Sequence, residues 1–354
     1  MGEITSVHFF VLVLSGILLL VVVLIIGVLL YGFFQYRKSV RLSGWLENIN
    51  QRISEAIVYD EQEQPDHHAF EQLTGNSSFR NLFLQKLVDS EKKFSGMAKD
   101  KIRDLFNRYG LRHEAEQKLD RKKAFLIAAG IQELTVMDSR DALPGISGFL
   151  LHPSPQVYQE AQYAMVSLKG FEGLNFLNTA KEKISEWQQL RLLFSVATIP
   201  ENSLPAVRSW LMSSNDSVVV FTLKLIRKFQ LLSFYPEVTG LLVHPSSEVR
   251  IRAVQTLVSL ENPSTMTDFT EVYPHQPSEV QSEIIRAMKV SKDKNTTELL
   301  KKELSENPAS GLKVHAAEAL FSLGHHEYLV QLMRNEATSD ELVQIVKYAL
   351  QEKI

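Results

Sequence analysis

Apolar residues are concentrated at the start of the chain, where residues 9–34 form a run of 26 without a charged side chain. A helix of that length extends about 39 Å, which is enough to cross the roughly 30 Å hydrocarbon core of a bilayer. A signal peptide typically begins with basic residues, has a shorter apolar stretch and ends at a small-residue cleavage site. Here no Lys or Arg precedes the run and no Ala-x-Ala site follows it. The pattern predicts an uncleaved transmembrane helix over residues 8–36, preceded by a short extracytoplasmic segment, residues 1–7.

The charges on the two sides of this run differ. Glu3 is the only charged residue before it, whereas Arg37, Lys38 and Arg41 follow it closely. Basic flanks remain on the cytoplasmic side of a membrane. We therefore expect a single-pass protein of the inner (plasma) membrane, with its N-terminus outside and its C-terminal domain in the cytoplasm. The lipid bilayer is the first predicted partner, through residues 8–36.

Helical periodicity continues after the run. Apolar residues recur with helical spacing between Leu42 and Ile57 and predict an amphipathic helix. This helix could pack against the helices that follow or lie on the membrane surface. Residues 59–65 are acidic and turn-like and predict a linker, and two further helices are expected near residues 79–89 and 97–109, the second ending at Gly110. Residues 37–118 are thus predicted to form a juxtamembrane helical connector and an irregular capping layer.

A repeating pattern fills the rest of the chain. Stretches such as 150–168, 211–229, 242–260 and 305–323 resemble one another, each with a Pro-, Ser- or Asn-rich turn before an apolar helix pattern. The first buried position of each such helix serves as a marker. The markers are Lys123, Val157, Trp187, Val218, Val249, Val280, Leu312 and Leu342. A nearly fixed period, here about 31 residues, predicts a repeat array.

Each repeat has the pattern of two antiparallel helices. After a marker, positions +4, +7, +8 and +11 share one helical face and are mostly small or aliphatic, as with Ala253 and Ala316 at +4. Shorter apolar helices are expected before the turns, at residues 142–151, 204–212, 237–243 and 297–304. The Trp187 repeat fits least well because its +4 residue is Arg191, although Trp187, Leu190, Phe194 and Ala197 still form an apolar face.

This pattern resembles the HEAT-repeat superfamily, in particular the short units of the bilin-lyase type. The resemblance rests on Val249, Arg250, Arg252 and Ala253 and on weaker copies of that motif. It covers residues 119–354, and the layout as a whole resembles bacterial single-pass membrane-anchored HEAT-repeat proteins. The resemblance implies an all-α fold: an N-terminal transmembrane helix followed by a right-handed α-solenoid of about eight two-helix HEAT-like repeats.

Composition and motifs narrow the function classes. The chain has 354 residues with 38 basic and 41 acidic side chains, so no global charge attracts nucleic acid. The absence of cysteine excludes disulfides, thiolate metal sites and a cysteine nucleophile. No nucleotide-binding or hydrolase motif is present. We expect no catalytic residue, no cofactor and no metal.

The histidines also favour structural roles. His152, His244 and His275 occupy the same place in the turns of three different repeats, too far apart to share a metal. The adjacent pairs at 67–68 and 325–326 do not face one direction on a helix. We expect turn residues rather than metal ligands.

One exposed row of the second helices is the candidate binding surface. Its members, six and nine positions after a marker, are Tyr163, Lys224, Arg227, Gln255, Arg286 and Lys289, which include a small basic patch. Apolar residues such as Val166, Leu193, Val196, Val258 and Phe321 occupy the same rows, so packing between adjacent repeats is the alternative explanation.

The sequence therefore predicts a membrane-anchored cytoplasmic scaffold or adaptor that binds other proteins, including a membrane-embedded complex, through its HEAT-repeat surface. A bilin-lyase-type or other small-molecule-modifying enzyme on the same scaffold is the alternative, and a trafficking or transport adaptor is a third possibility.

Overall fold

The computed structural model describes residues 2–59 and 68–351, and the side chains of residues 9–59 and 68–350. Within these ranges the chain is helical and contains no strand, as the predicted all-α class requires. It divides into two compact parts, residues 1–164 and 165–354, which we describe separately. Most of the predicted linker at residues 59–65, and the first histidine of the pair at 67–68, lie outside the described residues.

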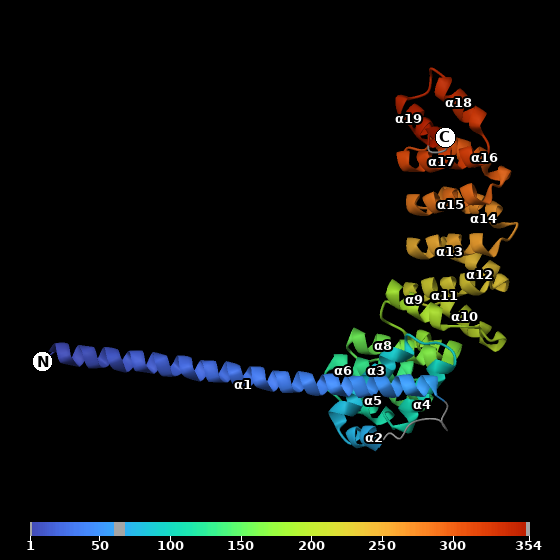
Figure 1. The fold of residues 1–354 in the computed structure, drawn as a ribbon. Coiled ribbons are helices and arrows are strands. Elements are labelled where there is room, and N and C mark those ends of the chain that lie inside the picture. The colour runs from blue at the N-terminus through green and yellow to red at the C-terminus, as the bar shows by residue number, and fades with distance from the viewer. Residues whose placement is uncertain (1, 60–67, 352–354) are drawn as a thin grey trace. The chain divides into compact units, whose positions relative to one another are not determined.

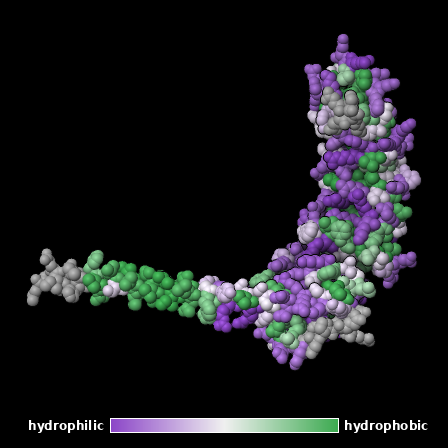
Figure 2. Space-filling model, viewed as in Figure 1, coloured by the Kyte–Doolittle hydropathy of each residue, from purple (hydrophilic) through white to green (hydrophobic). Residues whose placement is uncertain are grey.

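The chain begins with one long helix, α1 (Gly2–Val58). Its span Phe9–Val58 contains an 18-residue window of mean hydropathy 3.4, and the helix is long and apolar enough to cross a membrane. Figure 2 shows a predominantly hydrophobic surface along the extended part of this helix and hydrophilic side chains where the helix approaches the folded part. The predicted connector helix is not separate from this span, because no proline interrupts residues 35–58 and the helix continues through them, Gly44 included.

The C-terminal turns of α1 belong to the core of the first part. Ile49 is fully buried, and the Trp45 ring contacts the Phe79 ring at 5.6 Å. The helix packs against α3 (Ser77–Glu91) and α4 (Met97–Arg108), with α2 (His68–Thr74) nearby in sequence. Of the two alternatives for the amphipathic connector, the structure therefore has packing against the following helices.

The first part is completed by shorter helices. They are α5 (Arg112–Leu119), α6 (Ala124–Val136), α7 (Leu143–Ser147) and α8 (Pro155–Lys169), whose last residues belong to the second part. Helices α5 and α6 pack so closely that a Cβ at Gly130 would lie 2.7 Å from the carbonyl oxygen of Ala115. His152 accepts the backbone N–H of Ser154 at 3.1 Å in the turn before α8, and His244 accepts that of Ser246 in the same way. These two histidines have the turn role expected for them.

The second part consists of helix pairs that follow one another in the chain (Figure 1). The second helices α11, α13, α15, α17 and α19 stack in that order, while the first helices α10, α12, α14, α16 and α18 lie on the other side. Their bounds are α9 (Glu186–Ser195), α10 (Leu204–Leu211), α11 (Asp216–Phe229), α12 (Tyr235–Gly240), α13 (Ser247–Leu260), α14 (Thr265–Val272), α15 (Ser278–Ser291), α16 (Thr297–Glu306), α17 (Ser310–Ser322), α18 (His326–Arg334) and α19 (Asp340–Gln351).

The buried register of the second helices is tied to their N-caps. The third residue after the cap is buried in each of five consecutive helices: Gln188, Val218, Val249, Val280 and Leu312. Trp187 is 69% exposed, and Lys123 is the exposed N-cap of α6. The markers chosen at these two residues were wrong. Replacing them by Gln188 and Leu126 makes the spacing of the markers more even along the whole array.

The helix ends repeat with the same period. Gln230, Glu261 and Lys292 each follow a second helix and have positive φ angles of 51°, 52° and 55°. Gly324, with φ 91°, takes the corresponding place after α17. A left-handed residue ends a helix and satisfies its last carbonyl groups. The chain therefore leaves successive second helices by the same turn.

The α9 unit departs from this pattern. Its first helix is replaced by a 3-10 segment (Gly170–Thr179), in which a Cβ at Gly173 would lie 2.2 Å from the carbonyl oxygen of Met165. Helix α9 ends in extended backbone at Val196 rather than in a left-handed residue. Lys228 of α11 closes this end, since its ammonium group donates to the carbonyl oxygens of Leu193 and Val196, both at 2.7 Å.

The packing of the second helices can be tested at Ala253 of α13, which is fully buried in the core of the second part. Ala253→Leu should lower the free energy of unfolding by about 1–3 kcal/mol, because a well-packed core tolerates added methylene groups poorly. Chemical denaturation of the full chain in detergent would measure this loss. Lys302→Leu introduces the same side chain at an exposed position in the middle of α16 and should leave unfolding unchanged. Equal unfolding of parent and Ala253→Leu would show that this alanine is not at a helix contact.

Candidate functional site

The candidate site is one face of the stacked second helices in residues 165–354. We call it the inner face and define it by the residue nine positions after each N-cap: Phe194, Lys224, Gln255, Arg286 and Glu318, on α9, α11, α13, α15 and α17. All five side chains are exposed or half-buried. Because the caps repeat with the helices, these residues form one row across the stack.

Polar contacts connect neighbouring helices along this row. Gln255 donates to Glu283 at 2.8 Å, and Arg286 of the same helix as Glu283 pairs with it at 3.4 Å. Lys289 pairs with Glu318 of α17 at 2.6 Å. The predicted basic patch is therefore a ladder of mixed charge, because acidic residues from adjacent helices lie between its basic members. Two of these contacts, Gln255 with Glu283 and Lys289 with Glu318, join successive repeats. The partners are far apart in sequence, so the helical pattern did not predict that they meet.

One polar contact joins helices that are two units apart. Arg252 of α13 pairs with Glu186 of α9 at 3.2 Å, and α11 is the second helix between them in the chain. The extended Arg and Glu side chains together can cover two helix spacings of about 8–10 Å. The inner face therefore has a contact between α9 and α13 in addition to those between direct neighbours.

Burial disfavours the positively charged form of two groups on the inner face. Burial lowers the pKa of the Lys224 amine and Arg252 lowers it further, whereas Glu186 and Glu248 act in the opposite direction. The amine donates to the Gln189 side chain at 2.7 Å. Burial also lowers the pKa of the His315 imidazole, and Arg286 adds to that shift. A carboxylate placed on this face would favour the charged form of both groups.

The structure distributes the six predicted binding residues over two parts of the chain. Tyr163 lies half-buried on α8 within residues 1–164, and the other five lie in residues 165–354. Gln255 and Arg286 meet at Glu283, and Arg227 is exposed near the end of α11. Val166 and Val196, assigned to the same rows, are buried, so part of the apolar content of these rows is packing.

Sequence reasoning missed the apolar end of the inner face. Trp187, Leu190 and Phe194 were predicted to pack inside the repeat, but they are 69%, 42% and 76% exposed. The buried side of α9 instead contains Gln188, Gln189 and Leu192. The signal that could have found this was Ser185, whose side chain accepts the N–H of Gln188 at 3.2 Å as an N-cap. Counting from that cap gives the same register as in the other repeats.

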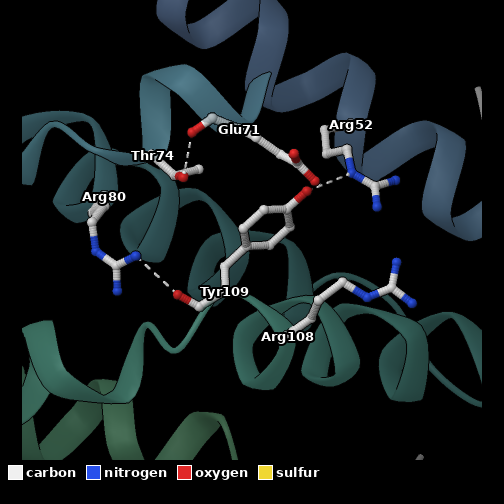
Figure 3. A pocket seen from close by; sticks show the side chains of 6 residues that line it. All are labelled: Arg52, Glu71, Thr74, Arg80, Arg108 and Tyr109. Carbon is white, nitrogen blue, oxygen red and sulfur yellow. Dashed lines mark hydrogen bonds between the residues drawn. The ribbon is translucent and has the colours of Figure 1, made fainter. Parts of the chain in front are cut away.

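A separate cavity of about 420 Å³ lies in the first part and is lined by Arg52, Glu71, Thr74, Arg80, Arg108 and Tyr109. Figure 3 shows Tyr109 reaching toward Arg52 of α1, whose Nε donates to the phenol oxygen at 3.2 Å. Arg80 donates to the carbonyl oxygens of Tyr109 and Gly110, both at 2.9 Å, and pairs with Glu114. These contacts close the end of α4 and fix it to α1 and α3.

Comparison with known proteins gives no family. No family model matches the chain, and no curated protein does either. Among solved structures, an engineered protein is similar with a TM-score of 0.34 and 15% identity over 86% of this chain and 98% of that one. The CpcE–CpcF complex of phycocyanin lyase from a Nostoc species has a TM-score of 0.27 and 13% identity over 84% and 98%. Human deoxyhypusine hydroxylase in complex with glycerol has a TM-score of 0.29 and 14% identity over 79% and 97%. With TM-scores this low, these likenesses support no argument about activity or partners.

Proposed function

We propose that this chain is a membrane-anchored adaptor: a HEAT-like α-solenoid, attached by α1, that holds other proteins on its inner face. The observation that carries the proposal is the inner face itself, a row of exposed or half-buried side chains on stacked helices that polar contacts join from one repeat to the next. Stacked helical repeats form extended surfaces that are suited to binding a partner. The polar ladder supports the same function, since its side chains are already held by hydrogen bonds and would lose little freedom on binding. The proposal assigns the chain no catalytic role.

The anchor follows from α1. Its apolar side chains from Phe9 onward are exposed in the isolated chain. Such a surface is unfavourable in water and favourable in the hydrocarbon core of a bilayer. Because the same helix enters the core of residues 1–164, the folded domain would be held close beneath the bilayer. The basic residues Arg37, Lys38 and Arg41 favour a cytoplasmic position for that domain in the plasma membrane.

Orientation can be tested with a reporter protein fused after residue 354. The basic flank of α1 should keep the fusion in the cytoplasm, so a reporter that is active only there should be active, and protease added to intact cells should leave the domain uncut. A matched variant, Arg37→Ser with Lys38→Ser and Arg41→Ser, should weaken this preference. An active periplasmic reporter on the parent chain would contradict the orientation and the cytoplasmic adaptor.

Partner binding can be tested by charge reversal on the inner face. Arg227→Glu combined with Arg286→Glu places two acidic groups on exposed positions of α11 and α15. Recovery of the proteins crosslinked to the parent chain in native membranes should fall about fivefold or more, as for an interface arginine that contributes strongly. Mass spectrometry of the purified chain would quantify the recovery.

Lys302→Glu combined with Arg334→Glu is the matched control, because it makes the same charge change at exposed positions of the first helices α16 and α18. Recovery with this control should equal that of the parent, and neither double variant should lower helicity. If both double variants recover every partner as the parent does, the inner face is not the binding surface.

A further inference from the structure

The two aromatic residues of the α9 stripe, which consists of Trp187, Leu190 and Phe194, have no counterpart in the later helices. At the position of Trp187, two residues after the N-cap, the later helices α13, α15 and α17 have Glu248, Glu279 and Gly311. At the position of Phe194 the later helices have lysine, glutamine, arginine and glutamate, whereas the position of Leu190 is mostly apolar in them as well. Two large exposed aromatic side chains therefore lie at one end of a largely polar face.

The stripe is held in place by its helix. Lys224 hydrogen-bonds to Gln189 at 2.7 Å, Gln189 donates to the carbonyl oxygen of Ile184 at 3.0 Å, and Lys228 closes the end of α9. These contacts use the side of α9 opposite to the stripe. The aromatic residues are consequently presented outward by a fixed helix, so their exposure is not the result of a loose one.

The spacing of the stripe matches one mode of recognition. Trp187, Leu190 and Phe194 lie at i, i+3 and i+7 and cover one side of a helix over about 10 Å. An amphipathic helix that lies alongside would present its own apolar residues at the same spacing. Exposed Trp and Phe are also the side chains that contribute most at protein interfaces.

Charge around the stripe selects the partner's polar residues. Residues 181–191 contain Lys181, Lys183 and Arg191 against Glu182 and Glu186. Glu186 is already paired with Arg252 of α13, and Arg227 is exposed on the neighbouring α11. Basic side chains therefore outnumber acidic ones on this segment and beside it, and an acidic partner complements them.

We propose that the stripe Trp187–Leu190–Phe194 is the docking site for an acidic amphipathic helix of another protein. This inference rests on the proposed adaptor function and names the part of the inner face that contributes most to binding. A bilayer is a poorer occupant, because the neighbouring ladder of mixed charge would have to lose its water against it.

The test is photo-crosslinking of the full chain in native membranes. The probe p-benzoylphenylalanine is placed at Phe194, and in a second preparation at Arg286, and crosslinked segments are identified by digestion and mass spectrometry. The probe at Phe194 should crosslink to a segment of another protein that has apolar residues at i, i+3 or i+4, and i+7 and acidic residues beside them. Trp187→Ser, with the probe still at Phe194, should lower the yield about tenfold.

Val290→Ser is the matched control, since it removes a side chain that is 71% exposed on α15 and should leave the yield unchanged. Crosslinks at Phe194 to lipid alone, to a second copy of this chain, or to a basic or non-amphipathic segment would overturn the inference. Crosslinks to protein at Arg286 with none at Phe194 would overturn it while the adaptor function stands. The absence of protein crosslinks at both positions would overturn both.

Discussion

The close stacking of the second helices determines which residues this protein can present to others. Each helix from α9 to α17 in this stack buries the third residue after its N-cap, and small residues seven positions after the cap, such as Ala253 and Ala316, are fully buried as well. Once that register is set, the residue nine positions after the cap must face outward on the inner face. The cap of α9, Ser185, applies the same rule to a helix whose outward residues are aromatic. The stripe of Trp187, Leu190 and Phe194 is thus a consequence of the packing constraint, in a helix whose buried side is largely polar.

A second constraint joins the apolar run to the fold. The helix that contains the run continues without a break into the core of residues 1–164, where Ile49 and Ile53 are buried. Arg52 of this helix contacts Tyr109 at the end of α4, and Lys101 of α4 donates to the carbonyl oxygen of Tyr59 at 3.2 Å. The described part of α1 therefore has no linker between the apolar run and the first folded layer, and the two share one helix.

Periodicity predicted most of the helices but not the α9 register. The helix predicted near residues 97–109 is α4, the one near 79–89 is α3, and the short first helices at 204–212 and 297–304 are α10 and α16. In α9 the hydrophobic rule selected Trp187, whereas the buried residues are Gln188 and Gln189, and Gln189 is satisfied by hydrogen bonds to Ile184 and Lys224. Apolar spacing cannot reveal a polar residue that is buried with its partners. The ion pair of Lys289 with Glu318 joins two adjacent repeats, and the spacing of residues within one helix could not predict it.

The most direct measurement of the central claim is the accessibility of single cysteines, which the chain allows because it has none of its own. In the purified, folded full chain, Trp187→Cys and Phe194→Cys should react with a maleimide much faster than Gln188→Cys and Leu192→Cys, whose positions are buried. After denaturation all four should react at similar rates. Fast labelling at Gln188→Cys and Leu192→Cys with protection at Trp187→Cys and Phe194→Cys would contradict the register, and with it the inner face that we describe.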